Sequence, residues 1–155
     1  MIVYKEGNIF YTSCFVMTNP TNSVGVMGAG LAKKFHSNFK EACEIFNDYC
    51  ISHQMGQRSL KLVKPMLIEA CDTLDSTSCM ILMFPTKIHW KNPSKYEYIE
   101  ENLKYTRTIL DKVKSPSIAF PALGCGLGGL NHVKVFDMIE KEFENYPSRV
   151  EIYTN

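Results

Sequence analysis

Two glycine-rich segments constrain the fold of this 155-residue chain more than any other feature. They occupy residues 19–30 and 121–129, and each follows a short apolar run and precedes an amphipathic helical pattern. A strand that leads through a glycine loop into a helix exposes backbone N–H groups and the positive end of the helix dipole to a phosphate. Two such segments in one small domain predict a ligand with two phosphates, held between two loops.

Apolar runs and helical periodicities alternate along the chain. The runs predict strands, with Pro65 indicating an edge or a bulge, over residues 1–4, 13–18, 60–70, 79–84, 117–120 and 150–153. Apolar residues at three- and four-residue steps predict helices over residues 28–50, 96–113 and 133–143. We expect the first helix to break near Ser37 and Asn38, and Ser94 to cap the second. This alternation predicts an α/β fold: a three-layer α/β/α sandwich with a mixed central sheet, forming a single domain over residues 1–155.

The composition excludes several classes of protein. Lys and Arg number 17 and Asp and Glu 16, and the net charge of +1 argues against an extended, non-specific grip on a nucleic-acid backbone. Contact with a nucleic-acid end or a single modified nucleotide stays open. The six cysteines form no CxxC pair, which favours buried thiols in a reducing compartment over disulfides or zinc ligands. Without a signal pattern or a bilayer-length apolar stretch, we expect a cytoplasmic monomer with no membrane partner, metal or cofactor.

The first glycine segment matches no common phosphate-binding motif. It lacks the Gly-Lys-Ser/Thr of a Walker A sequence and the G-x-G-x-x-G spacing of dinucleotide-binding folds. Asn19 and Asn22 precede its glycines, and side-chain amides can both donate to and accept from sugar hydroxyls. The alternative interpretation is that both are turn residues.

The second segment carries four glycines within residues 124–129. A tight turn needs only one or two, and missing side chains let an anion approach the backbone closely. We therefore predict phosphate contact here. Because ligands of open α/β sheets bind beyond the carboxyl ends of the strands, we expect one rim to gather residues 8–9, 19–30, 85–90, 121–129 and 154–155.

Three segments are distinctive in combination: Asn19-x-x-Asn22-x-x-Gly-Val-Met-Gly-x-Gly30, Phe84-Pro-Thr-Lys87-x-His89-Trp90 and Pro121-x-Leu-Gly-Cys-Gly-Leu-Gly-Gly-Leu130. In this order, over nearly the whole chain, they resemble the signature segments of the macro domain, the ADP-ribose-binding module. The resemblance is greatest to the branch that holds the DNA ADP-ribosyl glycohydrolase antitoxins and the terminal ADP-ribose protein glycohydrolases. The segment with Lys87 is the most specific, because ordinary macro domains lack it.

The resemblance implies that the ligand is ADP-ribose, free or attached to DNA or protein. The first loop would surround the distal ribose and a phosphate with Asn19, Asn22, Gly25, Val26, Met27, Gly28 and Gly30. The second would cradle the diphosphate with Pro121, Leu123, Gly124, Cys125, Gly126, Leu127 and Gly128. Asn8 and Ile9 would meet the adenine, although many macro domains carry Asp where this chain has the uncharged Asn8.

Lys87 is the residue with chemical reach, and the matching lysine of the resembling glycohydrolases is catalytic. As a desolvated amine it could attack the opened sugar and form a Schiff-base-type adduct. As an ammonium it could stabilise the leaving group or orient the ribose. We predict Lys87 and Asn22 as the catalytic residues; without the resemblance, Lys87 is simply a lysine at the solvent edge of a strand.

One departure bears on the mechanism. The protein-directed relatives carry an Asp in the second loop, where this chain has Gly128, as the DNA-directed branch does. His132 stands beyond the loop and is more typical of a solvated helix start than of a base. His89 is expected on the face opposite Lys87, as a supporting or nucleic-acid-facing residue.

These observations leave three functions open. The leading hypothesis is a glycohydrolase that removes ADP-ribose from a macromolecule, a DNA base or a protein, through Lys87. A phosphatase acting on ADP-ribose 1″-phosphate needs only a positioned water, and so could work without Lys87. A binding module that recognises ADP-ribose or a related nucleotide signal without turnover is the third.

Overall fold

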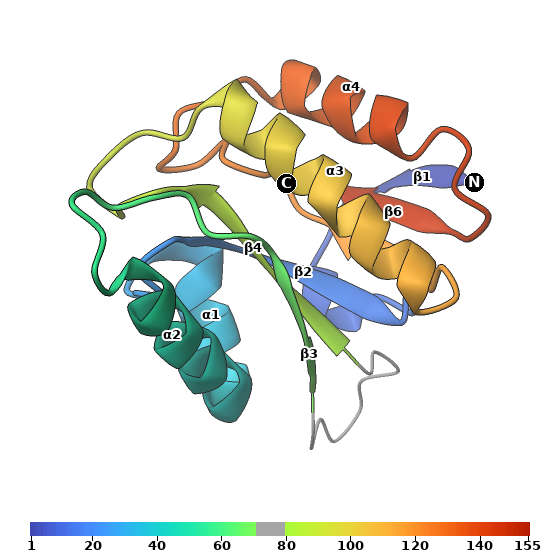
Figure 1. Cartoon of the computed structure of the whole chain (residues 1–155). Helices are drawn as coiled ribbons and strands as arrows, with labels where there is room; N and C mark the ends of the chain where they lie inside the picture. The colour runs from blue at the N-terminus through green and yellow to red at the C-terminus, as the bar shows by residue number, and fades with distance from the viewer. Residues whose placement is uncertain (71–79) are drawn as a thin grey trace.

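The computed structural model describes residues 1–70 and 80–155, and within them six strands form one sheet (Figure 1). The strands are β1 (Ile2–Lys5), β2 (Val16–Asn22), β3 (Met66–Glu69), β4 (Met80–Lys87), β5 (Ile118–Phe120) and β6 (Val150–Tyr153). Their order across the sheet is β1-β6-β5-β2-β4-β3. β3 is antiparallel to β4 and the other pairs are parallel, so the predicted mixed sheet is confirmed.

Helices cover both faces of this sheet. The helical elements of the described residues are the short 3-10 turn η1 (Ile9–Tyr11) and the helices α1 (Gly30–Asn38), α2 (Lys40–Gln54), α3 (Tyr96–Lys112) and α4 (His132–Glu142). α1 and α2 lie on one face and α3 and α4 on the other (Figure 1). The predicted three-layer sandwich is therefore confirmed, and so is the break near Asn38, where α1 gives way to α2.

Two apolar cores lie on opposite sides of the sheet. Successive strand residues alternate between them, because side chains of a strand point to opposite faces. Met17 and Met83 pack in the core beneath α1 and α2, whereas Val16 and Leu82 pack beneath α3 and α4. All four are fully buried, as expected for central strands whose apolar runs are continuous. β3 lies at an edge, directly after Pro65, as that proline predicted.

The structure corrects two local predictions. β2 and β4 continue beyond the predicted apolar runs, to Asn22 and Lys87, because the residues at their ends still pair, with an irregularity in the register between Thr21 and Asn22. Ser94 does not cap α3: the N-cap position is Lys95, which makes no side-chain capping bond. Ser94 is instead buried, and its hydroxyl donates to the hydroxyl of Thr86 at 3.4 Å.

The cysteines that the structure describes are free thiols. Cys14, Cys43 and Cys50 are buried, and burial raises the pKa of Cys43 to about 11 and that of Cys50 to about 12. Cys125 is half-buried. The other two cysteines, at positions 71 and 79, lie outside the described residues. Across residues 1–70 and 80–155, none of the helices has the length and apolar character needed to cross a membrane.

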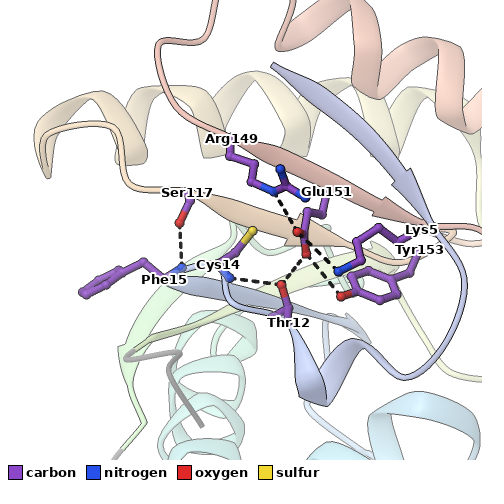
Figure 2. A network of polar contacts seen from close by, with 8 residues as sticks. All are labelled: Lys5, Thr12, Cys14, Phe15, Ser117, Arg149, Glu151 and Tyr153. Atoms are coloured by element: carbon purple, nitrogen blue, oxygen red, sulfur yellow. Dashed lines mark hydrogen bonds and ion pairs between the residues drawn. The ribbon is translucent and has the colours of Figure 1, made fainter.

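A buried carboxylate ties the N-terminal segment to the sheet (Figure 2). Glu151 on β6 is fully buried and accepts hydrogen bonds from the hydroxyls of Thr12 at 2.6 Å and Tyr153 at 3.2 Å. Arg149 donates to it at 2.8 Å, and Lys5 forms an ion pair at 3.7 Å. Burial alone would raise the pKa of Glu151. The hydrogen bonds and the nearby positive charges outweigh burial and hold that pKa below its ordinary 4.5.

This network predicts the effect of Glu151→Gln on stability. The amide keeps the shape but loses the charged acceptor, so we expect the free energy of unfolding at pH 7 to fall by about 2 kcal/mol. Because the folded-state pKa is depressed, the carboxylate's contribution is fully present above pH 4.5 and is lost as the pH falls through the folded pKa. Urea denaturation of both proteins across this range measures the difference.

Glu144→Gln is the matched control, because Glu144 is an exposed carboxylate. Its stability should stay within about 0.5 kcal/mol of the wild type. Equal losses in the two variants, or a difference between wild type and Glu151→Gln that persists unchanged at low pH, would contradict a stabilising role for the buried charge.

Candidate functional site

A cavity of about 590 Å³ opens where β2 and β4 end. The ends of both strands line it, together with the loop before α1 and the first turn of that helix, the loop after β5, the first residue of α4 and the end of the chain. Such a volume is typical of small-molecule sites. The position agrees with the rule that ligands of open α/β sheets bind beyond the carboxyl ends of the strands.

Most of the predicted site residues line this cavity. They are Asn22, Val26, Gly28, Gly30, Lys87, Pro121, Gly124, Cys125, Gly126, Leu127 and Gly128. The two glycine segments, far apart in the sequence, are therefore walls of one cavity. Asn8, Ile9, Asn19, Gly25, Met27 and Leu123 are not among its lining residues.

Asn19 departs from its predicted position facing the ligand. Its side chain is fully buried in the core beneath α1 and α2, where the amide nitrogen lies 3.5 Å from the sulfur of Met27 and 3.3 Å from that of Met83. Alternation along β2 explains this, because Asn19 shares a face with the core residue Met17. Leu123 is likewise held in the opposite core.

Asn8 caps η1, and its side-chain oxygen accepts from the backbone N–H of Phe10 at 2.9 Å. The cavity is reached instead by Asn155, which lines it. The Asn155 side chain accepts from the N–H of Gly7 and donates to the carbonyl of Gly7, both at 2.9 Å. The predicted adenine segment therefore adjoins the cavity through Asn155, which the sequence indicated only by its place after β6.

Asn22 organises the first loop. Its side-chain oxygen accepts from the backbone N–H groups of Val24 at 3.1 Å and Val26 at 3.3 Å, and its amide donates to the carbonyl of Val26 at 2.7 Å. One amide thus holds the chain in a tight loop at the cavity wall. Any contact of Asn22 with ribose hydroxyls, as predicted, must therefore form alongside these hydrogen bonds to the loop backbone.

Lys87, the last residue of β4, lies opposite Asn22 in the strand register. Ser23 connects the ends of β2 and β4: its N–H donates to the carbonyl of Ile88 at 2.9 Å and its hydroxyl to the carbonyl of Lys87 at 3.1 Å. The Lys87 side chain lines the cavity, and burial lowers the pKa of its ammonium from the ordinary 10.5. The amine form is therefore reached at a lower pH than in an exposed lysine. Among the described residues, the lining contains Lys87 and no Asp or Glu.

The first turn of α1 also faces the cavity, through Gly30, Leu31 and Ala32. Its N-cap residue, Ala29, makes no side-chain capping bond, and the first turn carries no acidic residue. The N–H groups and the positive dipole end are left for an anion. The Thr21 hydroxyl is also buried at the cavity wall and has no hydrogen-bond partner in the described part of the chain, so it is a further polar group that a ligand could engage.

The second loop follows its tight path because Gly128 has no side chain. A Cβ there would lie 2.9 Å from the Cβ of Ser94, and closer still to the Ser94 hydroxyl and the carbonyl oxygen of Gly124. The backbone N–H of Ser94 also donates to the carbonyl of Gly128 at 3.1 Å. Gly128 therefore leaves no room for the Asp found at this position in the protein-directed relatives.

Packing also explains a glycine of the first loop. Gly25 has a φ of +76°, and a Cβ on it would lie 2.8 Å from the Cα of Asn47 on α2. The Asn47 amide contacts the carbonyls of Val24 at 3.4 Å and Gly25 at 3.3 Å. Gly25 thus supports the loop from behind, outside the cavity lining.

The two histidines occupy different places. His132 begins α4, exposed, and lines the cavity. His89 lines a different cavity, whereas its neighbour Trp90 lines the first one; β4 ends at Lys87, so strand alternation does not set the direction of the His89 side chain. Thr21 lines the first cavity within the rim segment predicted over residues 19–30, although its residue type gave no signal, and Ala32 lines it without any sequence signal, because only its position at the start of α1 brings it there.

The fold and this site define a class: α/β/α domains with a cavity between glycine loops at the carboxyl ends of parallel strands. The chain belongs to the macro domain family, whose model matches residues 18–139.

Individual relatives agree with this assignment. The chain is 33% identical over 161 residues, covering 96% of its length, to a DNA ADP-ribosyl transferase-DNA ADP-ribosyl glycohydrolase fusion protein of Thermosipho africanus. It spans about 40% of the length of the curated relatives it matches.

Solved structures show the same fold. The macrodomain of Mycobacterium tuberculosis DarG matches with a TM-score of 0.88 and 28% identity over 100% of this chain and 99% of that one. Thermosipho africanus DarTG in complex with ADP-ribose matches with a TM-score of 0.85 and 33% identity over 98% of this chain and 41% of that one.

The packing at Gly128 predicts the effect of Gly128→Ala. The added methyl group must displace Ser94 or the loop backbone, so we expect the free energy of unfolding to fall by about 2 kcal/mol. Gly126→Ala is the control, because a Cβ at Gly126 meets no atom of the described residues within 4 Å and its backbone is not left-handed. Urea denaturation compares the two, and an equally stable Gly128→Ala would contradict the packing argument.

Proposed function

We propose that this chain binds ADP-ribose in the cavity at the ends of β2 and β4 and hydrolyses its linkage to a base of DNA. The observation that carries the proposal is a half-buried lysine, Lys87, in a cavity whose described lining offers no Asp or Glu side chain. A diphosphate meets no repulsion there, and it finds free N–H groups at α1 and the second glycine loop. The relative and the complex named above support the choice of ligand.

The ligand's orientation follows from these walls. The diphosphate lies between the start of α1 and residues 124–128, with the adenine towards Asn155 and the segment at Asn8. The distal ribose then lies beside Asn22 and Lys87. This orientation brings the sugar's anomeric carbon, where the macromolecule is attached, to the only lysine of the described lining.

Lys87 acts as a nucleophile in the step we propose. Its unprotonated Nζ bonds to the anomeric carbon while the bond from that carbon to the base breaks, and the electron pair leaves on the base. The base takes up a proton as the new ammonium loses one, and water then displaces the lysine. The products are free ADP-ribose, unmodified DNA and the regenerated amine. The lowered pKa of Lys87 favours the form that this step requires.

DNA is favoured over protein by Gly128. The protein-directed branch uses an Asp in the second loop, and Ser94 and Gly124 exclude any side chain at this position. The related fusion protein is named for DNA as well. Phosphate release from ADP-ribose 1″-phosphate, or binding of ADP-ribose without turnover, are the outcomes that would replace this proposal.

Substituting Lys87 tests the chemistry. With a single-stranded oligonucleotide ADP-ribosylated on one base, we expect Lys87→Ala to lower kcat at least about 100-fold while ADP-ribose still binds in calorimetry. Lys87→Arg is the matched control, because it keeps the positive charge but offers no amine nucleophile near neutral pH. It should be as inactive as Lys87→Ala.

The outcomes separate the parts of the proposal. Full activity of Lys87→Ala would overturn the role of Lys87. Activity retained by Lys87→Arg alone would leave the hydrolysis standing and replace the nucleophile with an electrostatic role.

The pH profile is a separate prediction. Because the rate follows the unprotonated amine, log kcat should rise with pH and level off below pH 10.5, the ordinary pKa of lysine. Steady-state rates between pH 5 and the alkaline limit of the fold measure it. A rate that instead falls as the amine loses its proton would show that the ammonium is the active form.

A further inference from the structure

A second cavity, of about 490 Å³, lies next to the first. Residues 87–90, here called the ridge, line both: Lys87 and Trp90 line the first cavity, and Ile88 and His89 line the second. A macromolecule that is attached to a ligand beside Lys87 and leaves the first cavity across the ridge brings its neighbouring units to the second cavity.

Aromatic rings and ammonium groups make up much of this region. Tyr98 and His89 line the second cavity. Lys95, on the same wall, has its Nζ 5.7 Å from the centre of the Tyr98 ring, and Lys91 has its Nζ 5.2 Å from the centre of the half-exposed Trp90 ring. Aromatic faces stack on bases and ammonium groups meet phosphates, so this combination is typical of sites for single-stranded nucleic acid.

The two segments that contribute residues to this cavity carry more basic than acidic residues, although the chain is almost neutral. Residues 55–65 contribute one wall through Leu60, and residues 87–98 contribute the others. Together these segments carry six basic residues and one acidic residue, namely Arg58, Lys61, Lys64, Lys87, Lys91, Lys95 and Glu97. The whole chain has 17 basic and 16 acidic residues, so the imbalance is local.

The ridge holds its rings in place. The Nδ1 of His89 accepts the backbone N–H of Lys91 at 3.1 Å, and the carbonyl of His89 accepts that of Asn92 at 3.0 Å. The His89 ring also stacks on Trp90, with 5.2 Å between centroids. Nδ1 is thereby occupied, and Nε2 is left to donate outward to a phosphate or a base.

We infer that the second cavity holds a nucleotide of the single DNA strand next to the modified base. Its base stacks against Tyr98 and His89, and its phosphates lie beside Lys91 and Lys95. This inference rests on the proposed function, because the modified nucleotide must sit at Lys87 for its neighbour to reach the second cavity. A single strand is required, since a paired base offers neither face to a side-chain ring.

The double variant Lys91→Ala/Lys95→Ala tests the charges. Fluorescence anisotropy with an unmodified, labelled single-stranded oligonucleotide, over a series of salt concentrations, measures affinity. We expect weaker binding, with the slope of log K against log salt reduced in magnitude by about 1.4, or about 0.7 for each phosphate contact. Lys112→Ala/Lys141→Ala is the matched control, because it removes two exposed lysines from the far ends of α3 and α4. An equal loss in the control pair, or no loss in the first pair, would overturn the inference.

Tyr98→Leu tests the stacking separately. Leucine keeps apolar bulk but removes the aromatic face, so single-strand affinity should fall about tenfold with no change in the salt slope. Duplex DNA of the same sequence should bind more weakly than the single strand to the wild-type protein. Equal affinity for the duplex, or unchanged binding by Tyr98→Leu, would contradict a stacked base in the cavity.

Turnover connects the cavity to the reaction. Relative to the wild type, the Lys91→Ala/Lys95→Ala variant should have a higher KM on an ADP-ribosylated oligonucleotide and an unchanged KM on the ADP-ribosylated mononucleoside. Its kcat should equal that of the wild type on each substrate. An equal rise in KM on the mononucleoside would overturn the inference. Absence of turnover by the wild type on both substrates would instead overturn the proposed function, while the anisotropy comparison would still decide whether the cavity binds DNA.

Discussion

The parallel pairing of β2 with β4 is the constraint on which the site depends. The register runs from Val16 opposite Met80 to Asn22 opposite Lys87, and both strands are buried on both faces. Apolar burial of this extent is the main favourable contribution to folding, and a shift by one residue would move every side chain to the other face. The position of Lys87 at the cavity is thus fixed by the cores on both faces of the sheet. The register irregularity between Thr21 and Asn22 then turns the chain into the first loop.

The two glycine loops at the cavity wall are supported by packing from behind. Asn47 fills the space behind Gly25, and Ser94 fills the space beside Gly128. At both positions the absence of a side chain lets the loop backbone approach its supporting residue closely, and Gly128 also lines the cavity. Ser94 connects the two binding elements, because it contacts Thr86 at the end of β4 and Gly128 in the second loop.

Much of the fold could be predicted from burial patterns. Short apolar runs indicated each strand of the described sheet, and the periodicities indicated the helices, because these signals are local. Strand ends were harder: the polar stretch from Asn19 to Asn22 carries no β signal, yet it pairs with β4. Ser94 has the residue type of an N-cap but serves another element, since burial against Gly128 outweighs a local capping bond.

The site could be predicted only in part, because sequence signals are local whereas the cavity joins segments that are distant in the chain. Glycine content and the segment around Lys87 identified the cavity walls, but Asn19 resembled a ligand residue although alternation along β2 buries it in the core. Asn155 and Thr21 reach the cavity by their place in the fold, with no motif of their own.

By itself, the sequence determined the order of strands, loops and helices, the glycine loops and the presence of a lysine at the end of β4, because each is set by residue type and local spacing. The tertiary structure alone decided which side chains converge. It placed Lys87 opposite Asn22, excluded any side chain at Gly128, and divided residues 87–90 between two cavities. These outcomes depend on strand register and on contacts between segments distant in the chain, which no local pattern encodes.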